Sequence, residues 1–232
     1  MTETSVPSFP RRDDREFGYA VARLTLGAIP GIGAVAQEVL DKAVGNPLRR
    51  RQEDWFAGLG EALADLVARM DGLTADSLAA DEVFVSTVAQ ASQQATATHS
   101  RVKREALRNI VLNTAAGVKL DNALLGSFLG YVQRFSEAHL KLLALMAHPM
   151  ADAAYAAEAK KVYMGSVQGV VEAAHPDLSA APGLLDRLYD DMSREGLLGG
   201  SPKALCSASG VQAAQTTAYG NAFLDFIRAP QA

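Results

Sequence analysis

The sequence predicts an all-α protein, a multi-helix bundle followed by a small C-terminal winged-helix-like module with a short β-hairpin. Apolar side chains recur at helical spacing up to His175, without the alternation that is typical of strands. Alanine and leucine dominate the apolar residues and aromatics make up only 6%, which favours closely packed helices. We therefore expect a flexible N-terminus at 1–12, a helical bundle at 13–175 and the C-terminal module at 176–232.

Capping residues and helix breakers divide the first part of the bundle. A helix is expected to begin near Asp13 and to end in the glycine-containing stretch 27–33, and a second helix covers about 31–44. Asn46, followed by a proline, begins a long helix that extends to about Met70.

The longest helix is expected between Asp81 and about Ala115. One face of this segment carries mostly small, apolar side chains at alternating steps of three and four residues, the spacing of closely packed helices. Asn109 and Asn113 continue that face, so we expect both to be buried and to need hydrogen-bond partners. They would satisfy loose backbone groups at a neighbouring helix end; a polar pocket in the bundle is the alternative.

The next helices are expected after Asp121 and Ser136, which have side chains suited to helix caps. An Ala-rich helix then covers about 151–174 and ends before Pro176. No strand is expected before the tail.

The tail follows the order helix, hairpin, helix. Pro182 begins a helix that ends at Gly196, and the glycine- and serine-rich stretch 196–217 is expected to form a β-hairpin. Thr217 caps a last helix. This is the order of the second half of a winged helix, and plain helical packing is the alternative.

Charge and composition exclude several classes of function. A net charge of −4 argues against a protein whose whole surface binds nucleic acid. The single cysteine, Cys206, cannot form an internal disulfide or a Cys-rich zinc site. The longest uncharged apolar stretch, 24–37, is too short to span a bilayer, and the N-terminus lacks the pattern of a secretory signal. A cytoplasmic location is expected.

Three stretches occur in a characteristic order: KREALRN at 103–109, FSEAHLKLL at 135–143 and TAYGNAFL at 217–224. This order resembles a broad group of bacterial proteins that includes the abortive-infection alpha family. The resemblance implies a helical body that leads into a hairpin and a Thr-x-x-Gly-x-x-Phe tail. It also implies a role in defence against phage or in stress response, by analogy alone. It carries over no catalytic residue.

The sequence offers no complete catalytic or metal centre. Glu172 and His175 have the spacing of two ligands on one helix face, but a second copy of the motif is missing, so a surface pair is expected. The stretch from Gly165 through Ser166 to Gly169 looks like a nucleophile motif, yet we expect it inside a helix, without the preceding strand. We expect no enzyme and no cofactor.

Two arginine groups are candidates for binding an anion or a partner. The first is Arg49, Arg50 and Arg51, and the second is Arg101, Arg104 and Arg108. Glu105 follows Arg101 by four residues, which predicts a local ion pair. A solvated helix face is therefore the alternative to a binding site.

The stretch 24–37 has two interpretations. Together with the first arginine group it is a candidate for insertion at an anionic membrane surface. The alternative is a tightly packed helix corner, at which glycines permit close approach. The residues concerned are Gly27, Pro30, Gly31 and Gly33.

From these patterns we expect a non-enzymatic interaction or effector protein in a bacterial defence or stress system. A protein partner is expected, and the helix faces with small apolar side chains suit self-association. A membrane-surface effector that acts through residues 24–51 is one alternative, and a DNA-binding winged-helix regulator is another. The segment at 183–195 would be the recognition helix, and it carries more acidic than basic residues, which disfavours nucleic acid.

Overall fold

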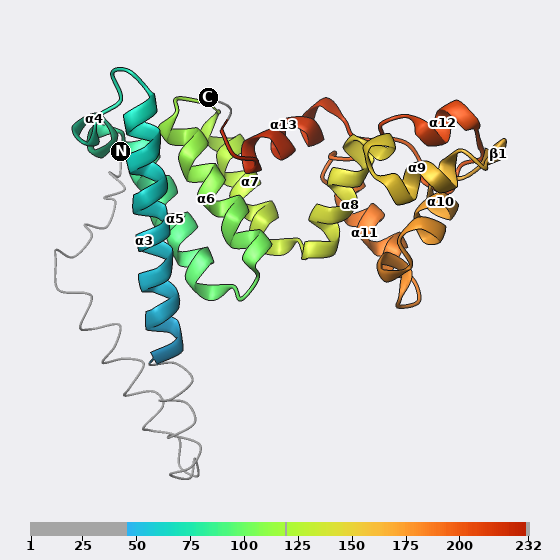
Figure 1. Ribbon diagram of the computed structural model, residues 1–232, viewed down its shortest axis with the longest axis horizontal. Helices are drawn as coiled ribbons and strands as arrows, with labels where there is room; N and C mark the ends of the chain where they lie inside the picture. The colour runs from blue at the N-terminus through green and yellow to red at the C-terminus, as the bar shows by residue number, and fades with distance from the viewer. Residues whose placement is uncertain (1–45, 119, 231–232) are drawn as a thin grey trace, which may run out of the picture. The chain divides into compact units, whose positions relative to one another are not determined.

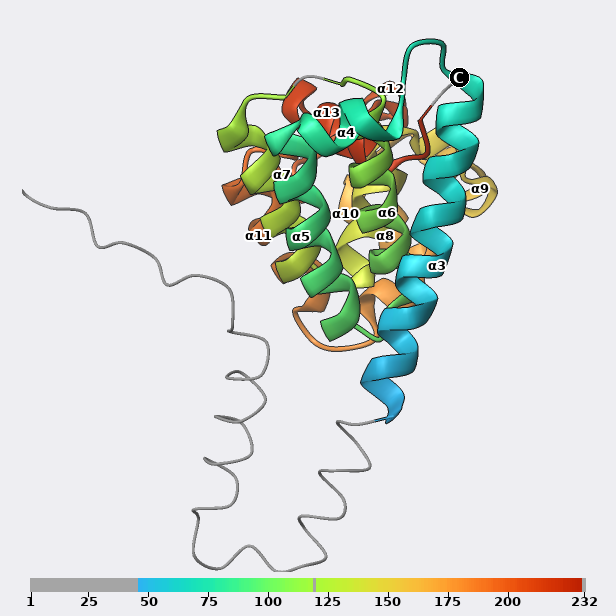
Figure 2. The ribbon, with the colours of Figure 1, turned by 90° about the vertical axis from the view of Figure 1, so that its left-hand side faces the viewer.

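The computed structural model describes residues 46–118 and 120–230 of the chain. Within them the chain forms eleven α-helices, two short 3₁₀ helices and one ladder of two short strands (Figures 1 and 2). The prediction of a mostly helical protein is confirmed. The expectations for residues 1–45, including the helices near Asp13 and at 31–44, fall outside the described residues.

The elements follow one another with short connections. The first six helices are α3 (Asn46–Arg69), α4 (Ala75–Ala80), α5 (Glu82–Ala97), α6 (Arg101–Ala115), α7 (Asn122–Arg134) and α8 (Glu137–Ala147). The remaining elements are η1 (Pro149–Ala151), α9 (Ala153–Ala159), β1 (Met164–Gly165), α10 (Val167–Ala174), η2 (Pro176–Ser179), α11 (Leu184–Arg194), β2 (Cys206–Ser207), α12 (Ala208–Gln212) and α13 (Ala218–Ile227).

Several helix boundaries agree with the sequence. The long helix from Asn46 is α3, which ends at Arg69. The Asp81 carboxylate accepts a hydrogen bond from the Val83 amide at 2.8 Å and so caps α5. At the end of α6, Gly117 adopts a φ of +80°, the left-handed conformation that commonly terminates a helix.

The expected single helix from Asp81 to Ala115 is wrong, because the chain breaks at residues 98–100. The Ser100 hydroxyl accepts the Lys103 amide at 3.1 Å and caps a new helix, and the Thr98 hydroxyl accepts the Ser100 amide at 3.2 Å. Such side chains offer the backbone partners that compete with a continuing helix. As a result α5 and α6 fold back and pack against each other (Figure 2).

The expected Ala-rich helix at 151–174 is also wrong. The chain forms η1 and α9, then strand β1, and only then α10. Strand β1 pairs antiparallel with β2, with Gly165 opposite Cys206. Ser166 therefore lies between a strand and a helix rather than inside a helix. Its hydroxyl accepts the Gly169 amide at 3.1 Å, so it serves as the cap of α10.

The tail contains only the base of the expected hairpin. Leu198 and Thr216 form an isolated antiparallel bridge, and the Gly199 amide donates to the Gln215 carbonyl at 2.8 Å. Further along, β2 pairs with β1 instead of with another strand of the tail, and α12 follows it. Helices α11 and α13 lie on either side of this segment in sequence, as expected.

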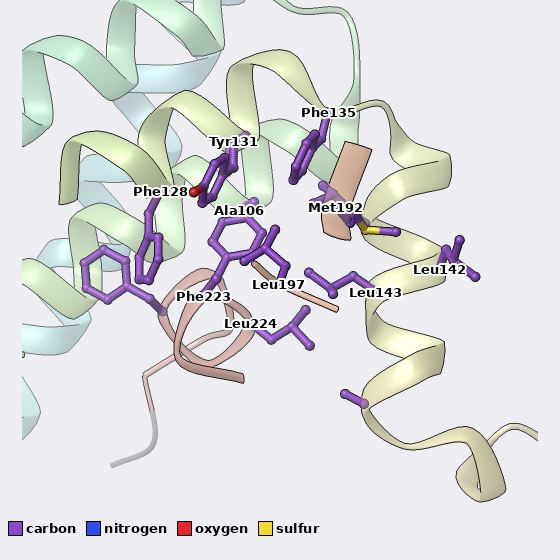
Figure 3. Close-up of a cluster of buried hydrophobic side chains, with 14 of the residues drawn as sticks. Ala106, Phe128, Tyr131, Phe135, Leu142, Leu143, Met192, Leu197, Phe223 and Leu224 are labelled. Carbon is purple, nitrogen blue, oxygen red and sulfur yellow. The ribbon is translucent and has the colours of Figure 1, made fainter. Parts of the chain in front are cut away.

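The core combines leucine-rich helices with one aromatic cluster (Figure 3). Phe128 on α7 lies 5.3 Å, centroid to centroid, from Phe223 on α13, and Tyr131 stacks on Phe135 at 5.4 Å. The buried side chains of α6, α7, α8, α11 and α13 belong to one continuous hydrophobic cluster. Helix α6 is therefore held between α5 on one side and α13 on another.

The Thr-x-x-Gly-x-x-Phe stretch has a structural explanation. The Thr217 hydroxyl donates to the Gly196 carbonyl at 2.6 Å and accepts the Gly220 amide at 3.0 Å, so it ties α13 to the end of α11. A Cβ atom added at Gly220 would lie only 2.2 Å from the Leu197 carbonyl oxygen, so this position requires glycine. Phe223 is fully buried. The three residues together fix α13 against the core.

Candidate functional site

Arginine side chains from two helices meet at the C-terminal end of α5. Arg51 on α3 donates to the Thr96 carbonyl at 3.0 Å, and Arg104 on α6 donates to the Thr98 carbonyl at 3.5 Å. The last carbonyls of a helix lack partners within it and carry the negative end of its dipole, so they attract cations. The end of α5 thus brings together two guanidinium groups that are far apart in the sequence.

Arg101 and Arg108 lie one turn before and one turn after Arg104, on the same side of α6. The Nε atom of Arg108 is buried and has no hydrogen-bond partner within residues 46–118 and 120–230. The ion pairs of that part of the chain include neither these three arginines nor Arg51. We call Arg51, Arg101, Arg104 and Arg108 the arginine corner.

The ion pair expected between Arg101 and Glu105 does not form. Glu105 instead lines a cleft bordered by α8 and α13. Arg50 is exposed on α3. The corner is defined within residues 50–232, which form one compact unit of the chain, and Arg49 is therefore left out of it.

The stretch 24–37, the candidate for insertion at a membrane surface, lies outside the described residues. It includes Gly27, Pro30, Gly31 and Gly33. Within the part of the chain that the structure describes, none of the helices combines the length and the apolar character needed to cross a bilayer.

Asn109 and Asn113 hold the end of α13. Both are 5% exposed. The Asn113 amide nitrogen donates to the carbonyls of Phe226 at 2.9 Å and Arg228 at 2.8 Å. The Asn109 amide nitrogen donates to the Ile227 carbonyl at 2.9 Å. The two side chains therefore act at a neighbouring helix end, the first of the two roles considered from the sequence.

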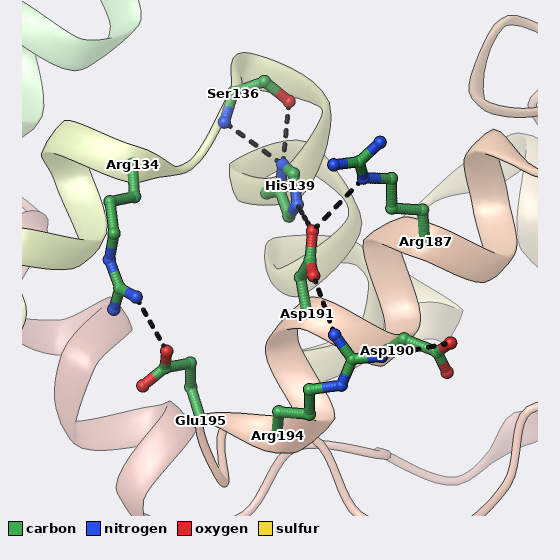
Figure 4. Close-up of polar contacts among 8 residues, drawn as sticks. All are labelled: Arg134, Ser136, His139, Arg187, Asp190, Asp191, Arg194 and Glu195. Atoms are coloured by element: carbon green, nitrogen blue, oxygen red, sulfur yellow. Dashed lines mark hydrogen bonds and ion pairs between the residues drawn. The ribbon is translucent and has the colours of Figure 1, made fainter.

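A serine, a histidine and an aspartate meet where α8 contacts α11 (Figure 4). The Ser136 hydroxyl lies 2.8 Å from Nδ1 of His139, and Nε2 of His139 lies 3.5 Å from the Asp191 carboxylate. Asp191 also faces Arg187 and Arg194, at 3.9 and 3.7 Å. The sequence gives no signal for this group, because Ser136 and His139 are three residues apart but Asp191 comes from a distant helix.

The geometry of this group is that of a helix cap. The backbone amide of Ser136 also donates to Nδ1 of His139, at 3.1 Å, as in a capping box. The same ring stacks on Phe135 at 4.9 Å. Burial lowers the pKa of His139 below its usual value, although Asp191 opposes the shift. A neutral imidazole that joins α8 to α11 is the role that these contacts support.

The remaining candidates have structural partners. His175 does not pair with Glu172; its Nε2 lies 3.1 Å from the carboxylate of Asp152, the cap of α9. Glu172 instead accepts from the Gln168 amide at 2.8 Å. The Cys206 thiol donates to the Gly165 carbonyl at 3.3 Å. Over residues 46–118 and 120–230, no group of three or more His, Cys, Asp or Glu side chains is arranged to hold a metal ion.

Comparison with known proteins gives no relative: no family model, curated protein or solved structure matches this chain. The resemblance to the abortive-infection alpha family stays an expectation from the sequence.

Proposed function

We propose that this protein is a non-enzymatic interaction protein that binds an acidic segment of a partner protein through the arginine corner. The observation that carries the proposal is that two guanidinium groups, of Arg51 and Arg104, meet at the end of α5, with Arg101 and Arg108 one turn to either side on α6. None of the four has an ion pair within the described residues. Guanidinium groups bind carboxylates through paired hydrogen bonds, and arginine is enriched at protein interfaces.

A protein partner fits better than nucleic acid. The chain carries a net charge of −4, so an extended polyanion would meet repulsion outside the corner. Helix α11 adds to this repulsion, because its acidic residues outnumber its basic ones. A short acidic segment can contact the corner without crossing those acidic surfaces.

We also propose that the C-terminal part is a winged-helix-like module used for protein contact. Supporting this, α11 is followed by the bridge between Leu198 and Thr216 and then by α13. Acidic residues of α11 lie beside basic ones, as in the ion pair of Asp186 with Lys203 at 2.9 Å. A role in bacterial defence rests on the family resemblance alone. Nuclease, toxin or restriction genes beside this gene would support that role, and an isolated locus would speak against it.

Fluorescence anisotropy tests the arginine corner directly. A short fluorescein-labelled polyglutamate peptide is titrated with the full-length protein at about 50 mM salt, at which exposed charges are only partly screened. Replacing Arg101 and Arg108 by Glu is expected to weaken binding by about tenfold or more, because each charge pair contributes up to about 1 kcal/mol. High salt is expected to weaken the wild-type complex.

The matched control replaces Arg69 and Lys160 by Glu, which gives the same change of net charge away from the corner. Both residues are exposed, and Arg69 lies at the far end of α3. Equal losses in the two double variants would show that only net charge matters and would refute the corner as a site. Tighter binding of a duplex DNA than of the peptide would replace the proposed partner class with nucleic acid.

A further inference from the structure

A cleft lies on another side of α6. Its volume is about 710 Å³, and it opens between α6, α8, η2 and the end of α13. Small side chains leave the space: Ala106 from α6, and Ala138 and Ala144 from α8. Leu178 and Leu224 add apolar surface. A volume of this size fits a small organic molecule.

The cations beside the cleft are already paired. The Lys141 ammonium lies 2.7 Å from the Asp177 carboxylate, and the Arg228 guanidinium lies 3.5 Å from the carboxylate of Asp225. An anionic ligand would therefore have to compete with carboxylates that already lie beside these two cations.

The groups left with bonding capacity are acceptors. Glu105 has neither an ion pair nor a side-chain hydrogen bond within the described residues, and it is exposed at the cleft. Glu137 accepts a hydrogen bond from the Ser100 hydroxyl. It also faces Lys103, whose ammonium donates to the Gln133 carbonyl at 2.8 Å.

The most informative acceptor is Asn109, which is 5% exposed and lines the cleft. Its nitrogen is used by the Ile227 carbonyl, which fixes the orientation of the amide. Its carbonyl oxygen is buried and has no hydrogen-bond partner in the described chain. A buried acceptor without a donor is costly, so a ligand that supplies an N–H group would relieve it.

We propose that this cleft binds a small organic cation, an amine or guanidine attached to a compact apolar body. The apolar body occupies the space beside the alanines and leucines, and the cationic nitrogen donates to the acceptors at Glu105 and Asn109, which lie one turn apart on α6. An anionic ligand would meet carboxylates, and a neutral apolar one would leave the Asn109 oxygen without a donor. The cleft is separate from the arginine corner, so this inference does not depend on the acidic-partner proposal.

Backbone-amide NMR titration of the full-length protein tests the inference with three probes of similar shape. They are phenethylamine, 2-phenylethanol and 3-phenylpropanoate. The amine is expected to bind about tenfold more tightly than the alcohol, because charge-assisted hydrogen bonds exceed neutral ones, and the carboxylate is expected to bind most weakly. Replacing Glu105 by Gln should weaken the amine about threefold, the effect of one exposed charge.

Two variants locate the binding. Ala144→Phe fills the cleft and should abolish amine binding, with the helical circular dichroism spectrum unchanged. Glu61→Gln, an equal change of charge at an exposed site on α3, should leave binding unaffected. Equal affinities for amine and alcohol, or tightest binding of the carboxylate, would overturn the cation assignment. Amine binding that survives Ala144→Phe would overturn the location.

A fourth probe separates a free amine from a protein side chain. A blocked Leu-Lys-Leu peptide is compared with phenethylamine. Binding of the peptide without binding of the amine would overturn the small-molecule assignment. Weaker binding of the peptide supports it.

Discussion

Asn113 should contribute more to stability than any other polar side chain of α6. It donates two hydrogen bonds, at 2.9 and 2.8 Å, to carbonyls at the end of α13, and its side chain is 5% exposed. Replacing it by Ala removes both hydrogen bonds and leaves the two carbonyls without these partners. At about 1 kcal/mol for each bond, with an added cost for unpaired buried groups, the loss should be about 2–4 kcal/mol.

Asn109→Ala is the matched control. It removes one hydrogen bond, to the Ile227 carbonyl, and at the same time removes a buried carbonyl oxygen that has no partner. The two effects oppose each other, so the cost should be about 1 kcal/mol or less. Urea unfolding of the full-length variants, followed by far-ultraviolet circular dichroism, measures both values. An equal or larger loss for Asn109→Ala would refute the idea that these bonds hold α13.

Three further predictions follow from single contacts. Gly220→Ala should lower the free energy of unfolding by about 2–3 kcal/mol, because the new Cβ would meet the Leu197 backbone, which cannot move aside. A thermal melt measures the loss, and an unchanged Tm would contradict it. The pKa of His139 is lowered in the folded state, so its stabilising contribution is complete above the unfolded value near 6.5 and is lost as the pH falls through the lower folded value. His139→Gln should therefore reduce the drop in urea midpoint between about pH 7.5 and about pH 5.5, and an unchanged drop would exclude this residue as its source. Trp55→Phe should cost about 1 kcal/mol or more in urea unfolding, because the indole donates a buried hydrogen bond of 2.9 Å to Ser92, and a loss near zero would contradict that role.

Local patterns in the sequence predicted the helices well where a cap or a breaker was strong. Asp81 caps the start of α5, and α6 ends at Ala115, as predicted. The helix was wrongly predicted to continue through residues 98–100, because the small side chains keep their helical spacing across this segment. Thr98 and Ser100 form local hydrogen bonds that compete with the helix. The Ala-rich stretch at 151–174 misled the prediction for a similar reason, since alanine favours helix everywhere and does not mark where a strand interrupts it.

The candidate sites depend on contacts between distant segments, and the sequence could suggest only parts of them. The two arginine groups were visible, but their convergence on the end of α5 required the break that places α6 beside α5. The burial of Asn109 and Asn113 was expected, because both continue a helix face of small apolar side chains. Their common partner, the end of α13, and the cleft between α6 and α8 follow only from tertiary packing.

Hydrogen–deuterium exchange of the full-length protein, with and without saturating polyglutamate peptide, tests the central claim most directly. The account predicts slower exchange in the end of α5 and the first half of α6, residues 94–108, and no change in α11. Protection confined to α11 or to the tail, with residues 94–108 unaffected, would contradict the assignment of the arginine corner as the partner-binding surface.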